Sequence, residues 1–500
     1  MKKSLIFYMV LILSCGVSCA SCEKTNGNGT PDTSDPDIIT HEEPATQNLL
    51  RAMQITDKAI ESYFNQTTMA MTEFYNPFTG SSSSGTVDVW PYTSAIEAVN
   101  AIMHALSAQK EAGDATLYDE NFSRYAELLG KLYKGLQYYE GSFELISYTQ
   151  TRNWSVYSVH RSDIPGSAAV AGIDNVYDDQ QWIIRELLEA YKLTGNEEYL
   201  EKAEYLTDYV IDGWDCTLAP DWTENGGITW GPGYTTKHSC SNGPFVSPLV
   251  WLSEIYAGSG ETATYRYIDS SKKRLTKEMD KSEYYMMYAK KVYDFQKTHL
   301  MDQTNGVYYD MLGGPSGMND TNIDKMDDAS KAKVYETVDG IKYKAYLEPG
   351  GPNGTPLSYN SGTMLSGAAD LYRATKDDSY RQDMEKLTDA CFKYFAKPDA
   401  DIPGLYSYAY DGFNNWFNGV MLRGWVNVFE ESGYKGTHDP IKSFQDNLDY
   451  GYTNHVKDGI LPGNLYLGWP KSESSCTVKG FFQFAFAAEY AVLAKYMIEQ

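Results

Sequence analysis

Cysteine, histidine and long hydrophobic runs are all scarce in this 500-residue chain. It has seven cysteines and seven histidines, and no HExxH pattern. The four cysteines that follow residue 22 lie far apart and form no CxxC pattern. Such a sequence excludes a disulfide scaffold and a clustered transition-metal centre. A segment at 320–324 begins like a calcium loop but lacks the Gly and the bidentate Glu that such a loop requires. We therefore expect no metal and no other cofactor.

Basic residues are also in deficit, with 42 Lys and Arg against 67 Asp and Glu, a formal net charge of −25. A surface of this sign repels phosphate backbones, so we expect no nucleic-acid partner. Neutral ligands such as sugars are indifferent to the charge. The chain is 14% aromatic, which favours ligands with a flat, partly apolar face.

The first 22 residues have the pattern of a secretory signal peptide. Lys2 and Lys3 form a basic start, and an apolar run follows over 5–13. This run is too short for a membrane span, and no later segment approaches about 18 uninterrupted apolar residues.

Small residues directly before a cysteine resemble a bacterial lipobox, which predicts lipidation at Cys22 or Cys19. Residues 23–44 are rich in Gly, Asn, Thr, Asp and Pro and are typical of a flexible tether. We expect an outer-membrane lipoprotein, facing the cell surface or the periplasm, with its lipid anchor as the sole membrane contact. Cys216 and Cys240 flank one loop, and the sequence leaves open whether they pair.

From residue 45 to the end, helical periodicity dominates and strand patterns are rare. The spacing of apolar residues predicts twelve helices, at 45–64, 92–112, 120–140, 179–194, 197–212, 243–257, 281–300, 361–375, 378–396, 416–431, 439–450 and 479–498.

A sequence pattern that occurs twice predicts that these helices form hairpins. The segment at 191–199 has the same pattern as the one at 372–380: a helix end, a short polar turn, and a tyrosine that starts the next helix. Six such hairpins can close into an (α/α)6 toroid, which makes residues 45–500 a single all-α domain. An open solenoid is the alternative, but its fixed repeat length is absent.

Long loops interrupt the helices at 214–240, 258–280 and 303–358. The first is rich in tryptophan, which is costly to expose unless it packs on the domain or meets a sugar face. The third contains a predicted β-hairpin at 334–344, because Asp339-Gly340 is typical of a type I′ turn.

The best candidate for catalysis is Tyr177-Asp178-Asp179-Gln180-Gln181-Trp182, where two carboxylates open an amphipathic helix. Two like charges held close push their pKa values apart, so that one carboxyl ionises while the other keeps a proton. Retaining glycosidases use that division of labour between a nucleophile and a general acid/base. The alternative is ordinary capping, because Asp is favoured at helix starts.

In the toroid the even-numbered helices line the inside, and their N-termini share one rim. The predicted helices begin on that rim with unusual sequences: Asp178-Asp179, Asn242-Gly243, Asn360-Ser361-Gly362 and the segment 411–419. The positive ends of these helices would converge on one cleft and stabilise a carboxylate there. Local capping explains each start individually, but not their recurrence on one rim.

These segments resemble glycoside hydrolase family 76, which comprises α-1,6-mannanases and related fungal transglycosylases. The resemblance rests on Tyr-Asp-Asp-x-x-Trp at 177–182, Ser-Asn-Gly at 241–243, Tyr-Asn-Ser-Gly at 359–362 and Trp-Phe-Asn-Gly at 416–419. It implies an (α/α)6 barrel, a retaining mechanism, and an α-mannan substrate for a monomeric, Bacteroidota-type lipoprotein.

The same resemblance implies that Asp178 is the nucleophile and Asp179 the general acid/base of an endo-acting α-1,6-mannanase. Tyr177, Trp182, Asn242, Asn360 and Trp416 are the predicted substrate-binding residues.

Two other functions remain open from the sequence. A different (α/α)6 glycosidase, such as a uronyl hydrolase, would need a basic residue in the cleft, for which Lys237, His238 and Arg423 are the candidates. A non-catalytic glycan-binding lipoprotein would use aromatic loops to hold polysaccharide without cutting it.

Overall fold

The computed structural model describes residues 43–500. The predicted signal peptide, the lipidation at Cys22 or Cys19 and almost all of the tether lie outside the described residues. No helix within 43–500 is long and apolar enough to cross a membrane.

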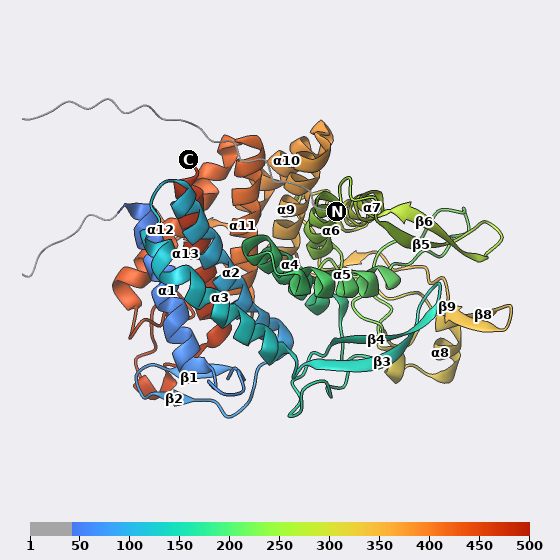
Figure 1. Cartoon of the computed structure of the whole chain (residues 1–500), viewed down its shortest axis with the longest axis horizontal. Coiled ribbons are helices and arrows are strands. Elements are labelled where there is room, and N and C mark those ends of the chain that lie inside the picture. The colour runs from blue at the N-terminus through green and yellow to red at the C-terminus, as the bar shows by residue number, and fades with distance from the viewer. Residues whose placement is uncertain (1–42) are drawn as a thin grey trace, which may run out of the picture. The chain divides into compact units, whose positions relative to one another are not determined.

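All twelve predicted helices are present, and one short helix, α8, is added within the third long loop (Figure 1). The helices are α1 (Pro44–Tyr63), α2 (Val89–Glu111), α3 (Thr116–Leu136), α4 (Tyr177–Thr194), α5 (Glu197–Asp212), α6 (Val246–Ile255), α7 (Lys281–Leu300), α8 (Asp328–Val334), α9 (Ser358–Thr375), α10 (Asp378–Phe395), α11 (Asn414–Ser432), α12 (His438–His455) and α13 (Gly480–Ile498). A 3-10 turn, Gly243–Phe245, leads into α6.

Six helices form a closed inner ring, which confirms the predicted (α/α)6 architecture. In this ring α2 packs against α4, α4 against α6, α6 against α9, α9 against α11, α11 against α13, and α13 against α2. Helices α1, α3, α5, α7, α10 and α12 pack around it, each against an inner neighbour.

Burial separates the two layers as their sequences require. The inner helix α13 is buried on nearly every side, consistent with its almost uniformly apolar sequence. The outer helix α3 buries one stripe, with Tyr125, Leu129, Leu132 and Leu136 at three- and four-residue spacing. Inner helices also approach one another closely: a Cβ on Gly362 of α9 would lie 2.7 Å from the Cα of Met421 in α11.

Three β-hairpins lie to one side of the ring (Figure 1): β3–β4, β5–β6 and β8–β9. Their strands are β3 (Glu140–Ile146), β4 (Thr151–Tyr157), β5 (Thr262–Ile268), β6 (Arg274–Asp280), β8 (Tyr335–Val338) and β9 (Ile341–Lys344). The predicted hairpin is β8–β9, and its turn residues Asp339 and Gly340 both have positive φ, at 52° and 81°. The other two hairpins are additions to the prediction.

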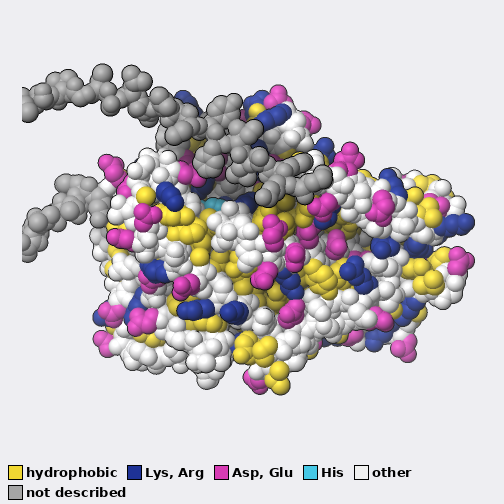
Figure 2. All heavy atoms as spheres, in the orientation of Figure 1, with side chains coloured by type: hydrophobic (Ala, Val, Ile, Leu, Met, Phe, Trp, Pro, Cys, Tyr) yellow, Lys and Arg dark blue, Asp and Glu magenta, His cyan; other side chains and the backbone are white. Residues whose placement is uncertain are grey.

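Short strands form three further small sheets. They are β1 (Phe74–Asn76) with β2 (Ser81–Ser82) and β13 (Val478–Lys479), β7 (Met311–Leu312) with β10 (Pro352–Asn353), and β11 (Lys397–Pro398) with β12 (Tyr406–Ser407). On the face shown in Figure 2, acidic and basic side chains are interspersed with small hydrophobic patches.

Candidate active site

A cleft of about 520 Å³ opens where the inner helices begin. Residues at or next to the N-termini of α2, α4, α9 and α11 line it, together with part of the loop before α6. The sequence predicted this convergence of helix N-termini on one rim. The carboxyls of Asp178 and Asp179 belong to this lining.

Both aspartates lie in the first turn of α4, and the loop before α6 holds that turn in place. The backbone N–H of Tyr177 donates to the carbonyl oxygen of Trp230 over 2.8 Å. The backbone N–H of Asp179 donates to Oδ1 of Asp178 over 3.1 Å. Asp178 also accepts hydrogen bonds from the thiol of Cys240 and the indole of Trp230. Cys216 and Cys240, whose pairing the sequence left open, are both free thiols.

The surroundings give the two carboxyls different proton affinities. Burial raises the pKa of Asp178 to about 6, and the hydrogen bonds that it accepts oppose that rise. Asp179 accepts no hydrogen bond from residues 43–500. Burial raises its pKa well above the usual range, and the charges of Asp178 and Asp88 add to this. Asp178 is therefore the first to ionise, and Asp179 keeps its proton. This arrangement supplies a carboxylate and a neutral acid side by side.

Aromatic rings form much of the cleft wall. Trp90 and Trp182 both pack edge-on against Trp416, with ring centroids 4.9 and 4.6 Å apart. Trp230 stacks on His238 at 5.0 Å, and Tyr359 stacks on Phe417 at 4.1 Å. Such flat apolar surfaces suit the C–H faces of sugar rings.

The cleft is acidic: five aspartates line it, and the described residues place no lysine or arginine there. Of the basic candidates named from the sequence, Lys237 is buried and paired with Asp215 over 2.9 Å, while Arg423 pairs with Glu97 inside the ring. His238 does line the cleft, but burial lowers its pKa to about 4, so its imidazole is neutral near pH 7. A cleft of this charge is poorly suited to a uronide.

Trp182 is the predicted substrate-binding residue that lines the cleft. Tyr177 lies behind the wall instead, with no exposed surface and its ring centroid 5.1 Å from that of Tyr209. Trp416 packs behind Trp90 and Trp182 and donates its indole N–H to Glu97 over 2.7 Å. These two side chains support the cleft rather than face it.

The two predicted asparagines are also fully buried. The amide of Asn242 accepts from the backbone N–H of Ile228 at 2.9 Å and donates to the carbonyls of Ile228 and His238, so it fixes the loop before α6. Asn242 therefore shapes the cleft from behind its wall. Asn360 lies beside Asp310. Burial raises the pKa of the Asp310 carboxyl, and Asn360 lowers it.

Sequence reasoning missed several residues of the cleft, above all Trp90, Trp230, Cys240 and Asp310. Trp230 and Cys240 belong to the tryptophan-rich loop that was singled out for its length. Asp310 follows α7 in an irregular segment that carries no local signal.

Comparisons with known proteins agree with this geometry. The model of Glycosyl hydrolase family 76 matches residues 145–260 and 330–442. No curated protein matches the chain. The fold is similar to that of a family 76 glycoside hydrolase (mannosidase) from Bacteroides thetaiotaomicron, with a TM-score of 0.63 and 22% identity, over 91% of this chain and 99% of that one.

It is also similar to an inactive variant of an alpha-1,6-mannanase from a Salegentibacter species, solved in complex with alpha-1,6-mannotriose. The TM-score is 0.55 and the identity 16%, over 90% of this chain and 99% of that one. At these identities the structural likeness shows the fold, and the sequence model supplies the family. The chain is a glycoside hydrolase that belongs to glycoside hydrolase family 76.

Proposed function

We propose that the protein is an endo-acting, retaining glycoside hydrolase of α-1,6-linked mannan, with Asp178 as nucleophile and Asp179 as general acid/base. The observation that carries the proposal is the carboxyl pair at the start of α4, in which one member ionises well before the other. In the first step the Asp178 carboxylate would attack the anomeric carbon while Asp179 protonates the leaving oxygen. In the second, Asp179 would deprotonate the water that releases the sugar from Asp178.

The lining of the cleft supports a neutral substrate. Aromatic rings offer stacking surfaces, and among the described residues the lining has no lysine or arginine to pair with a uronide carboxylate. The aspartates Asp88, Asp174 and Asp310 can accept hydrogen bonds from sugar hydroxyls. These features disfavour the uronyl hydrolase alternative.

Known structures point the same way. The Salegentibacter variant is described as inactive with two consecutive aspartates replaced by asparagine, and it is in complex with alpha-1,6-mannotriose. This chain has three consecutive Asp pairs, Asp178-Asp179, Asp327-Asp328 and Asp377-Asp378. The first is the pair that lines the cleft.

The test is hydrolysis of unbranched α-1,6-mannan, followed by chromatography of the early products and by NMR of their anomeric protons. An endo-acting, retaining enzyme releases a ladder of short oligosaccharides whose new reducing ends start as the α-anomer. Release of mannose alone would show exo action, and initial β-anomers would show inversion. Inertness on mannan combined with activity on a uronide would reverse the substrate assignment.

We also propose that the enzyme is an outer-membrane lipoprotein anchored through Cys22 or Cys19. The support is the lipobox-like sequence and the polar segment that follows it. Metabolic labelling with a palmitate analogue in a bacterial host tests the anchor. Label should be lost in a Cys22→Ala or a Cys19→Ala variant, and retention in both single variants and in the double variant would contradict the proposal.

A further inference from the structure

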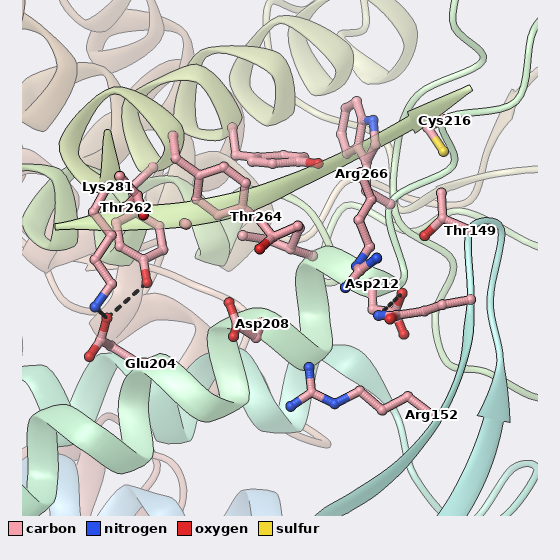
Figure 3. Close-up of a pocket in the computed structure, with 17 residues that line it drawn as sticks. Thr149, Arg152, Glu204, Asp208, Asp212, Cys216, Thr262, Thr264, Arg266 and Lys281 are labelled. Carbon is pink, nitrogen blue, oxygen red and sulfur yellow. Dashed lines mark hydrogen bonds and ion pairs between the residues drawn. The ribbon is translucent and has the colours of Figure 1, made fainter. Parts of the chain in front are cut away.

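A second pocket, of about 360 Å³, lies outside the ring (Figure 3). Its walls come from the outer helices α5 and α7 and from the hairpins β3–β4 and β5–β6. It shares no lining residue with the cleft that holds Asp178 and Asp179. The β5–β6 hairpin that closes it belongs to the 258–280 insertion.

Three charged side chains in this pocket have unused hydrogen-bonding capacity. The Asp208 carboxylate, on α5, makes no hydrogen bond and no close ion pair with any residue that the structure describes, and no dashed line reaches it in Figure 3. The guanidinium groups of Arg152, on β4, and Arg266, on β5, are likewise without a hydrogen-bonded partner, although Arg152 lies over the ring of Trp154 at 3.9 Å. One strong acceptor and two strong donors are thus left for a ligand.

Neighbouring charges are, by contrast, fully engaged and fix the frame of the pocket. Glu204 pairs with Lys281 over 2.7 Å and accepts hydrogen bonds from the hydroxyls of Tyr256 and Tyr285. Asp212 accepts from Ser147 over 2.7 Å, and from Gln150 and Trp154 at longer distances. Among the described residues, the charged groups of the pocket without a hydrogen-bonded partner are therefore only those of Asp208, Arg152 and Arg266, and the charges beside them are hydrogen-bonded.

Aromatic residues supply the apolar part of the wall. Trp214 and Tyr288 pack edge-on, with ring centroids 6.2 Å apart. Tyr284 and Tyr288 are 5% and 3% exposed, and neither hydroxyl has a hydrogen-bond partner among residues 43–500. Because both residues line the pocket, their hydroxyls can donate and accept hydrogen bonds with a ligand there.

The charge balance selects the class of ligand. Three carboxylates (Glu204, Asp208, Asp212) face three cations (Arg152, Arg266, Lys281), so the pocket has no strong preference for an anion or a cation. Paired donors and acceptors beside aromatic rings match the vicinal hydroxyls and C–H faces of a sugar. We propose that this pocket is a second, non-catalytic binding site for a neutral saccharide. The choice of a mannosyl probe below rests on the proposed function, but the site itself does not.

Calorimetric titration of the full-length chain tests the proposal. In a protein carrying Asp178→Asn and Asp179→Asn, which prevents hydrolysis, α-1,6-mannotriose should bind at two sites. Adding Arg266→Gln or Asp208→Asn should weaken one of them about tenfold to a hundredfold, because a hydrogen bond to a charged group is lost. The other site should be unchanged. Asp208→Asn preserves side-chain size, whereas Arg266→Gln shortens the side chain and removes its charge. Melting temperatures are measured to check that both variants fold.

Matched controls are Glu201→Gln on the exposed part of α5 and Lys273→Gln beside the β5–β6 turn, neither of which lines the pocket. Each should leave both sites intact. Cellotriose and maltotriose are titrated in parallel, so a failure of the mannan assignment at the cleft is separable from a failure of the pocket. Saccharide binding that is insensitive to Arg266 and Asp208, or a pocket that takes inorganic phosphate and none of the three trisaccharides, would overturn the proposal.

Discussion

The thiol of Cys240 donates a hydrogen bond to the carboxylate of Asp178. The bond joins the loop before α6 to the first turn of α4, and among the effects that lower the pKa of Asp178 it is the largest. The buried thiol has a pKa well above its usual range, so it stays protonated and remains a donor. Cys240 is thus a positioning residue that keeps the Asp178 carboxylate ionised.

Cys240→Ala should move the acidic limb of the kcat/KM profile to higher pH. A hydrogen bond to the charged form stabilises it, so losing the bond raises the pKa of Asp178 above its value of about 6. We expect a shift of about 0.7 pH unit for a bond worth about 1 kcal/mol. Cys240→Ser keeps a donor and should behave like the wild type. An unchanged profile in the alanine variant would contradict the assigned role.

Asp179→Asn should stabilise the fold at pH 8 and have little effect near pH 4. Burial and the charge of Asp178 raise the pKa of Asp179 in the folded state, so the folded protein holds this proton more tightly than the unfolded chain does. The stability that this proton contributes is complete at pH values below the pKa of Asp179 in the unfolded chain. It is lost as the pH rises through the pKa of Asp179 in the folded protein. Asparagine avoids that loss. Thermal unfolding of both proteins at the two pH values is the measurement, and an equal difference at both would exclude this explanation.

Arg423→Gln should lower the free energy of unfolding by about 3 kcal/mol, because it leaves the buried Glu97 without its cation. That pair links the inner helices α2 and α11. The exposed pair of Lys442 and Asp446 is the matched control: Lys442→Gln should cost less than about 1 kcal/mol. Chemical denaturation of the three proteins gives the comparison. Similar costs for both variants would argue against a structural role for the charges within the ring.

Gly362→Ala should destabilise the protein by about 1–3 kcal/mol, because the added methyl group would meet the backbone of Met421, which cannot move aside easily. Gly130→Ala, on the outer helix α3, meets nothing within 4 Å. It should stabilise the protein by about 0.5–1 kcal/mol through lower backbone entropy in the unfolded chain. Melting temperatures that move in opposite directions would confirm the distinction, whereas a stable Gly362→Ala protein would refute it.

Gly362 also shows that the sequence can indicate an important position without indicating its structural role. It was singled out as part of an unusual helix start on the rim, but in the structure it permits close contact between α9 and α11. Asn242 was singled out in the same way, and it fixes a loop through three backbone groups. Local sequence marks such positions, but it does not identify their partners, such as Met421 for Gly362 and Ile228 for Asn242.

Periodicity predicted the helices well, because each buries a stripe or is buried entirely. The hairpin β8–β9 was predictable from Asp339-Gly340, which favour a tight turn. The turn of β5–β6 instead places Lys272 at a φ of 61°, a conformation that lysine does not signal. Trp90, Trp230 and Asp310 reach the cleft only because the ring closes, so no local pattern identifies them.

Hydrolysis of linear α-1,6-mannan by the wild type and its single Asp→Asn variants tests the central claim most directly. The wild type should release new reducing ends, and Asp178→Asn and Asp179→Asn should each reduce that rate by at least about a thousandfold while binding of mannan persists. Asp378→Asn, in an exposed Asp pair at the start of α10, should retain full activity. A wild type that binds mannan without producing reducing ends, or an Asp178→Asn variant that remains active, would contradict the account.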